Sequence, residues 1–135
     1  MTLIDQLRRD EGVRSTVYLD SRGIPTIGVG RNLRDVGLSD PEVDFLLAND
    51  IQRAEDGLSG FAWYQGLDDV RKGAVTNMAF NLGVAGLLHF PHMIAALAKQ
   101  DWSGAAAEMV NSDWAKQVGA RATRLEQQIL TGEWQ

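Results

Sequence analysis

The sequence predicts an α+β protein, with a small β-hairpin near the N-terminus followed by a mainly helical body. Residues 15–20 alternate between apolar and polar side chains, which is the period of a strand, and turn residues follow them. From about residue 40 onward, apolar side chains recur at helical spacing behind capping residues. A chain of 135 residues is long enough for one domain or for two small lobes that share a core.

The first helix is predicted from Thr2 and Asp5, which are spaced as a capping box ahead of apolar residues at helical intervals. Gly12 is a typical helix stop, so Glu11 falls in the last helical turn.

A strand from Ser15 to Asp20 and a return strand from Ile24 to Val29 form the predicted hairpin. If Gly23 centres the turn, Asp20 lies opposite Thr26, with Cβ atoms about 4.5–5.5 Å apart. Pro25 has no N–H to donate, so the return strand is expected to be an edge strand or to carry a bulge.

The rest of the chain is predicted to be loop and helix. Residues 32–38 form a loop, and Ser39-Asp40-Pro41-Glu42 begins a helix over about residues 40–57. A connector precedes the helix that Asp68 caps and Gly83 ends; its apolar stripe is so broad that we expect it to be the central buried helix. Residues 84–89 are expected to be a short helical turn or a loop, and Asp113-Trp114 to open a short turn. Helices are predicted at about residues 91–99, 101–110 and 121–130, the last of them stopped by Gly132.

Composition excludes several classes of protein. The absence of cysteine excludes disulfides and thiolate metal sites, and a net charge of −5 argues against an unspecific nucleic-acid binder. No apolar run approaches the roughly 18 residues of a membrane span, so we expect no stable membrane insertion. His89 and His92 have no third ligand nearby in the sequence, and we expect neither a metal nor a cofactor.

One specific motif starts at Glu11 and ends at Gly30: a Glu, eight residues, an Asp, five residues and a Thr in a T-I-G-x-G context. Weaker motifs are the run from residue 77 to 83 and the segments around Trp114, Arg121 and Trp134. With these motifs the chain resembles the phage-type lysozymes, glycoside hydrolase family 24, which are endolysins of double-stranded DNA bacteriophages. The matches together span nearly the whole chain.

The resemblance implies a lysozyme-like two-lobed fold. About residues 11–40 would form the small β lobe with the catalytic cleft, and a helix over about residues 40–57 would connect it to the second lobe. About residues 60–135, together with the N-terminal helix, would form the helical lobe. The activity implied is hydrolysis of the β-1,4 bond between N-acetylmuramic acid and N-acetylglucosamine in bacterial peptidoglycan.

The resemblance also implies roles for single residues. Glu11 would be the general acid, while Asp20 and Thr26 would hold the attacking water and the product would be anomerically inverted. An inverting site keeps its two carboxyl groups roughly 6.5–9.5 Å apart to leave room for that water. Arg121, from the last helix, would lie against Glu11 and fix its rotamer.

Substrate-binding candidates are Phe80, as a face on which a sugar stacks, and Asn81, as an amide for an N-acetyl group. Arg31 and Asn32 are candidates in the loop after the glycines, where relatives often carry a histidine and an apolar residue; the ion pairing and packing of this loop are therefore expected to differ. Gly28 and Gly30 are expected to permit tight bends or close sugar approach, because no lysine completes a phosphate loop.

The expected partner is the glycan strand of peptidoglycan, bound by a monomer without nucleic acid. With no signal peptide apparent, we expect synthesis in the host bacterial cytoplasm and holin-dependent passage to the periplasmic wall, for host cell lysis. Two alternatives stay open: a non-catalytic wall-binding or virion-structural module, and a lytic transglycosylase that forms an anhydro-sugar. The joint presence of Asp20 and Thr26 argues against both.

Two departures from the family concern the whole chain. It is acidic, whereas many relatives are basic, which argues against strong electrostatic adhesion to anionic walls. It is also shorter than many relatives, and the shortening is expected between Leu33 and Leu67.

Overall fold

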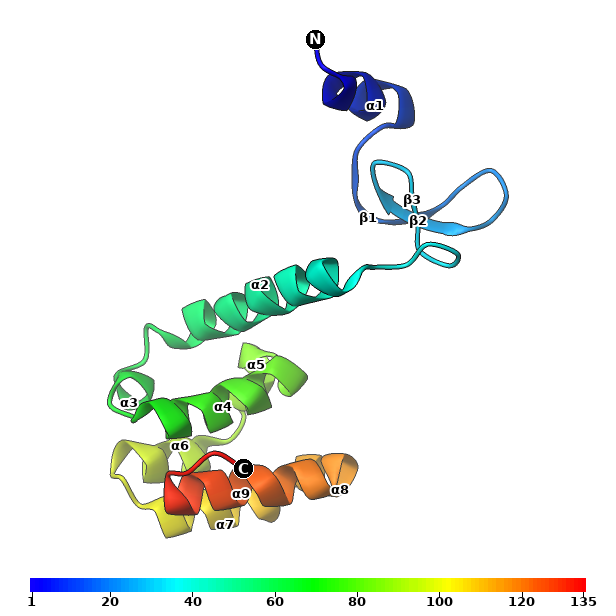
Figure 1. The fold of residues 1–135 in the computed structure, drawn as a ribbon. Helices are drawn as coiled ribbons and strands as arrows, with labels where there is room; N and C mark the ends of the chain where they lie inside the picture. The colour runs from blue at the N-terminus through cyan, green and yellow to red at the C-terminus, as the bar shows by residue number, and fades with distance from the viewer. The chain divides into compact units, whose positions relative to one another are not determined.

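The computed structural model describes residues 1–135, which form nine helices and three short strands (Figure 1). Contacts divide the chain into two compact units, Met1–Leu46 and Leu47–Gln135. The predicted α+β class is confirmed. The elements in chain order are α1 Leu3–Glu11, β1 Arg14–Leu19, β2 Pro25–Gly28, β3 Arg31–Asn32, α2 Asp40–Leu58, α3 Ala62–Gln65, α4 Asp69–Leu82, α5 Val84–Leu87, α6 Pro91–Ala98, α7 Trp102–Val110, α8 Asp113–Val118 and α9 Ala120–Thr131.

Helix α1 begins and ends where the sequence predicts. The Thr2 hydroxyl accepts the Asp5 amide at 3.2 Å, and the Asp5 carboxylate accepts the Thr2 amide at 2.8 Å, which completes the capping box. Gly12 ends the helix with φ 78°, a backbone conformation that glycine adopts without strain. Glu11 is therefore the last helical residue.

A third strand extends the predicted hairpin into a sheet of order β1-β2-β3, with antiparallel pairs throughout. The predicted loop over residues 32–38 was wrong at its start, because Arg31 and Asn32 pair with Ile27 and Thr26. The chain can reverse within Val29 and Gly30 since Gly28 and Gly30 both have positive φ values, 70° and 67°.

The predicted register of the hairpin was wrong. Tyr18, not Asp20, lies opposite Thr26, and the Asp20 amide bonds instead to the carbonyl of Ile24 at 3.0 Å. Gly23 does not centre the turn; with φ 75° it is the last residue of a three-residue loop, which the 2.9 Å bond from its amide to the Asp20 carbonyl closes. Asp20 and Thr26 consequently become diagonal neighbours, about 7–8 Å apart.

Pro25 lies in the central strand, not in an edge strand. Because Asp20 and Ile24 are joined by a hydrogen bond, the next pair, Leu19 and Pro25, occupies a non-hydrogen-bonded position where β1 needs no N–H from β2. The predicted irregularity exists in this pairing, but it lies between Arg14 and Tyr18 in β1.

Helix α2 starts with the predicted capping box, in which Ser39 Oγ donates to Glu42 Oε1 at 2.8 Å and accepts the Glu42 amide at 3.3 Å. The helix runs to Leu58, one residue beyond the prediction, and its C-terminal part buries Ala54 and Leu58. The connector that follows contains the short helix α3 around Tyr64.

The core of the second unit is built around α4, as predicted. This helix starts at the Asp68 cap and ends at Gly83, and it buries Ala74, Val75, Thr76, Met78 and Ala79. Helices α6, α7 and α9 contribute further large buried side chains, which are Met93, Leu97, Met109, Leu125 and Ile129. The hydroxyls of Tyr64 and Thr76, both buried, satisfy each other at 3.0 Å.

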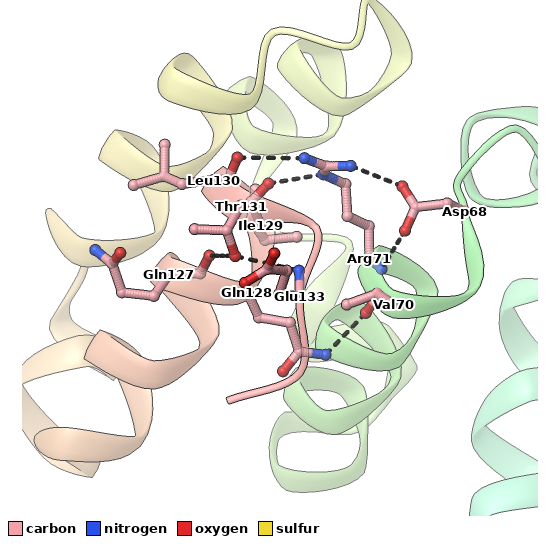
Figure 2. A network of polar contacts seen from close by, with 9 residues as sticks. All are labelled: Asp68, Val70, Arg71, Gln127, Gln128, Ile129, Leu130, Thr131 and Glu133. Carbon is pink, nitrogen blue, oxygen red and sulfur yellow. Dashed lines mark hydrogen bonds and ion pairs between the residues drawn. The ribbon is translucent and has the colours of Figure 1, made fainter.

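A polar network around Arg71 joins the start of α4 to the end of α9 (Figure 2). Its guanidinium donates to the carbonyls of Ile129 and Leu130 at 2.7 and 3.2 Å and pairs with Asp68 at 2.9 Å. It also stacks over the ring of Trp102, 4.1 Å from the centroid. Arg71 thereby satisfies two of the carbonyls that the end of α9 leaves without helical partners.

None of the helices has the length and the apolar character that a membrane crossing would require.

Candidate active site

Glu11 lies at the C-terminal end of α1, and its side chain packs along the backbone of Gly30 in the turn after β2. A methyl group built on Gly30 would be 3.2 Å from Glu11 Oε2, 3.6 Å from Cδ and 3.7 Å from Cβ. Close packing of α1 on this turn therefore depends on the absence of a side chain at residue 30. The sequence suggested close approach at the glycines, but not that Glu11 would be the neighbour.

The two carboxylate oxygens of Asp20 have different surroundings. Oδ1 accepts the amides of Arg22 and Ile24 at 2.8 and 2.9 Å, which fixes the side chain across the turn, whereas Oδ2 has no hydrogen-bond partner in the protein. The Ile24 amide, aided by the Arg22 amide and the charges of Arg22 and Arg34, lowers the pKa of Asp20 against partial desolvation. Asp20 therefore carries a fixed negative charge and one free oxygen.

Thr26 is buried, with 3% of its surface exposed, and its hydroxyl donates to the Ile24 carbonyl at 2.8 Å. Because the proton of the hydroxyl is committed, the oxygen retains only its acceptor capacity for a further partner. Asp20 and Thr26 lie on the same face of the hairpin, since Asp20 lies opposite Ile24 and Thr26 is two residues from Ile24 along the chain.

Arg31 and Asn32 both bond within their own unit. Arg31 donates to Glu42 at 2.6 Å and to the Gly37 carbonyl at 3.1 Å, so it fastens the sheet to the start of α2. The side-chain oxygen Oδ1 of Asn32 accepts the amides of Arg34 and Asp35 and shapes the turn after β3. The ion pair that Arg31 forms in this loop is therefore the one with Glu42.

In the second unit, Arg121 lies beside Asn77 of α4. Its Nε donates to the Asn77 side chain at 2.9 Å and one terminal nitrogen donates to the Asn77 carbonyl at 3.1 Å. The predicted contact of Arg121 with Glu11 stays a prediction. Asn77 was not predicted as a site residue, although it is one helical turn from Phe80 and Asn81 and so shares their face.

Phe80 is 44% exposed, unlike the other large side chains of α4, and it lines a cavity of about 820 Å³ together with Asn77, Arg121 and Trp134. Asn81 is held by Trp114, whose indole Nε1 donates to the side-chain oxygen Oδ1 of Asn81 at 2.8 Å. The side-chain nitrogen of Asn81 therefore remains available as a donor. No sequence pattern links residues 81 and 114, because their proximity arises from the packing of α8.

No three acidic or histidine side chains converge in an arrangement that could hold a metal ion.

Comparison with known proteins assigns these residues to one family. The phage lysozyme family matches residues 8–128, a range that includes Glu11, Asp20, Thr26 and Arg121. The chain is 29% identical to probable T4-type lysozyme 1 of Dictyostelium discoideum, over 95% of this chain and 93% of that protein. It is 35% identical to the endolysin of Salmonella phage P22, over 59% of this chain and 60% of that protein.

A third relative is much longer. The pre-baseplate central spike protein Gp5 of Enterobacteria phage T4 is 30% identical over 98% of this chain, and the chain spans only 28% of its length. That alignment covers 161 positions whereas the chain has 135 residues, so the chain lacks segments that the relative has. Since the family match covers most of the sequence, the chain belongs to the phage lysozyme family.

Proposed function

We propose that this protein is a muramidase, which hydrolyses the β-1,4 bond between N-acetylmuramic acid and N-acetylglucosamine in bacterial peptidoglycan with inversion. The observation that carries the proposal is the spacing of Glu11, Asp20 and Thr26 inside the segment that matches the phage lysozyme family. Family membership supports a glycosidase-type hydrolase. The bond that is cleaved, the stereochemistry and the roles of the residues are proposed here in addition.

Glu11 is the general acid of the proposed reaction. It gives its proton to the glycosidic oxygen as the bond from that oxygen to the anomeric carbon breaks. The packing of its side chain against Gly30 supports this role, because a proton donor has to be held where the leaving oxygen departs.

Asp20 and Thr26 hold the attacking water. The water donates one hydrogen to the free Oδ2 of Asp20 and the other to the Thr26 oxygen, whose own proton is bound by Ile24. Its lone pair then attacks the anomeric carbon on the face opposite the leaving oxygen, and Asp20 takes the proton that the water loses. The lowered pKa of Asp20 keeps the carboxylate ionised for this task.

Phe80, Asn81 and Arg121 serve the substrate in this proposal. The exposed ring of Phe80 offers a face on which a sugar stacks, and the side-chain nitrogen of Asn81 offers a donor for an N-acetyl carbonyl. Arg121 orients Glu11 with the guanidinium nitrogen that Asn77 leaves free. Arg31 and Asn32 serve chiefly to shape the loop beside the site, since their polar atoms are bonded within it.

The biological role that fits this chemistry is lysis of the host cell by a monomer that acts on the periplasmic wall. The protein would be made in the bacterial cytoplasm and would reach the wall through a holin-dependent membrane lesion. The similarity to the endolysin of Salmonella phage P22 supports this role.

A second candidate is a structural module of a virion, which the similarity to the central spike protein of phage T4 favours. The two candidates differ in one measurable property, because a purely structural module releases no fragments from peptidoglycan.

The test is digestion of purified peptidoglycan, with the products analysed by mass spectrometry and their anomeric form followed by NMR. The wild type is expected to release fragments with a reducing N-acetylmuramic acid end, formed first as the α-anomer. Glu11→Gln is expected to lose at least about 1,000-fold of the activity, since it cannot donate a proton, and Asp20→Asn a comparable amount.

Glu133→Gln is the matched control, because Glu133 is an exposed carboxylate whose replacement should leave the rate unchanged. Anhydro-muramic ends would instead identify a lytic transglycosylase. Absence of any release by the wild type would favour the structural module.

A further inference from the structure

Gly28, the last residue of β2, and Gly30, in the turn that follows, both have positive φ values but different surroundings. Gly28 has φ 70° and Gly30 has φ 67°, so a side chain would be strained at either position. A methyl group on Gly28 would meet no atom within 4 Å, whereas one on Gly30 would meet the Glu11 carboxylate at 3.2 Å, closer than ordinary van der Waals contact. The chain thus contains a built-in comparison that separates backbone strain from contact with Glu11.

We propose that Gly30 is a positioning residue for Glu11: its bare Cα is the surface on which the carboxyl group rests in its reactive position. The inference deepens the proposed function and rests on it, since it takes Glu11 to be the general acid. The contact runs along the Glu11 side chain, from Cβ through Cδ to Oε2, and not through one atom alone.

A side chain at residue 30 would act on Glu11 because the carboxyl group is the movable partner in this contact. The backbone of Gly30 is fixed by the turn between β2 and β3, while Glu11 can rotate about its side-chain bonds. A methyl group would therefore push the carboxyl group aside by a few tenths of an ångström. Catalysis is sensitive to displacements of this size, and one of about 1 Å can cost about 100-fold in rate.

The first experiment is a thermal-unfolding cycle that needs no activity. Gly30→Ala and Gly28→Ala are each measured in the wild-type chain and in the Glu11→Ala chain. Glu11→Ala is expected to relieve part of the loss of Tm that Gly30→Ala causes, because it removes the clash and leaves the strain. The loss of Tm that Gly28→Ala causes is expected to be the same with and without Glu11.

A loss of Tm for Gly30→Ala that Glu11→Ala leaves unchanged would overturn the proposal. If Gly30→Ala alone does not fold, recovery of folding by Glu11→Ala in the same chain supports the contact. Failure of that double variant to fold, while Gly28→Ala folds, overturns it.

The second experiment measures kcat and KM on peptidoglycan fragments. Gly30→Ala is expected to lower kcat on the order of 10-fold or more with KM nearly unchanged, because the proton donor is displaced and the substrate contacts are not. Gly28→Ala is expected to lower kcat less than Gly30→Ala does, because its methyl group does not meet Glu11. Equal kcat values for the two variants would overturn the positioning role.

The two proposals fail in different ways. If wild type and Glu11→Gln are equally active, the proposed role of Glu11 fails, while the unfolding cycle still reports whether Gly30 and Glu11 touch. If Glu11→Gln is inactive but Gly30→Ala behaves as Gly28→Ala does, only the positioning role of Gly30 fails.

Discussion

The two oxygens of the Asp20 carboxylate differ in their surroundings, and only one of them is free to bind a further partner. Oδ1 is bonded to the amides of Arg22 and Ile24 and belongs to the turn, while Oδ2 is free. A carboxylate that accepts backbone amides is stabilised in its charged form, which is why the pKa of Asp20 is lowered. The turn thereby keeps the Asp20 carboxylate, the proposed holder of the attacking water, ionised at any pH near neutrality.

The lowered pKa of Asp20 makes a prediction about acid stability. Because the folded pKa lies below the unfolded value of 3.8, the stabilisation by the charged form is complete above that value. It is lost as the pH falls through the lower folded pKa. The wild type is therefore expected to have a higher Tm than Asp20→Asn at pH 6, and the difference is expected to shrink between about pH 4 and pH 2.

Thermal unfolding from pH 6 to pH 2 measures this difference. Four other carboxylates with lowered pKa values are present in both proteins and give them a common acid response; they are Asp5, Asp35, Glu42 and Asp68. A difference in Tm that stays constant over the whole range would show that the charge of Asp20 contributes nothing to folding.

At the scale of elements, the hairpin register decides which residues lie beside Asp20 and Thr26, the proposed water-holding pair. Leu19 and Pro25 occupy a non-hydrogen-bonded position, where opposite Cα atoms lie about 4.5 Å apart, within the range that a disulfide spans. The chain has no cysteine of its own, so an introduced pair is unambiguous. The variant Leu19→Cys with Pro25→Cys is expected to oxidise readily to a disulfide.

The control is the variant Leu19→Cys with Ile27→Cys, which would be opposite only in the register that the turn sequence suggests. It is expected to remain reduced under the same oxidising conditions. Thiol titration and mass spectrometry of unfolded samples distinguish the two states, and a disulfide in the control alone would contradict the observed register.

Arg71 links three helices of the helical unit. It contacts residues of α4, α7 and α9, and its side chain is 14% exposed. Arg71→Ala is expected to lower the free energy of unfolding by about 2–4 kcal/mol, because two buried carbonyls lose a charged donor. Arg71→Lys is expected to cost about half as much, since one ammonium group cannot reproduce the planar fork.

Urea unfolding measures these costs. Arg53→Ala is the control: the side chain is 81% exposed, its pair with Asp50 is 3.5 Å long, and its loss is expected to stay within about 0.5 kcal/mol. Equal losses of unfolding free energy for the Arg71 and Arg53 variants would show that the contacts of Arg71 add no stability.

At the scale of the whole molecule, the net charge of −5 sets how the protein meets its proposed substrate. Bacterial walls are anionic, so long-range forces repel this chain where they would attract a basic relative. Adding salt shortens the reach of this repulsion to about 10 Å at 0.1 M.

Activity on intact cell walls is therefore expected to rise as the ionic strength increases from about 10 to 100 mM. The rate on short soluble glycan fragments, which carry far fewer charges than a wall, serves as the control and is expected to change little. Turbidity clearing measures the first rate and chromatography the second. A steep fall of wall lysis with salt would instead show that a basic surface binds the wall.

Much of the fold was predicted from local sequence, because the forces that begin and end a helix act within one turn. The capping boxes at Thr2 and Ser39, the Asp68 cap and the glycine stops at Gly83 and Gly132 all stand where the sequence places them. The broad apolar stripe of α4 likewise identified the buried centre of the helical unit.

The register of the hairpin could not be predicted in the same way, because it depends on which amides the Asp20 side chain captures. The sequence shows a turn at residues 21–23 but does not distinguish a three-residue loop from a longer one. Strand β3 could not be predicted for a similar reason. Its two residues carry no periodicity, and they form a strand because they pair with Thr26 and Ile27.

By itself, the sequence determined the family, the α+β class and the spacing of Glu11, Asp20 and Thr26, since these depend on residue identity and local order. Only the tertiary structure decided which residues contact the candidate site residues. Gly30 against Glu11, Glu42 against Arg31 and Trp114 against Asn81 are pairs far apart in the chain. Contacts of this kind arise when packed elements bring distant backbone together, and no pattern of neighbouring residues encodes them.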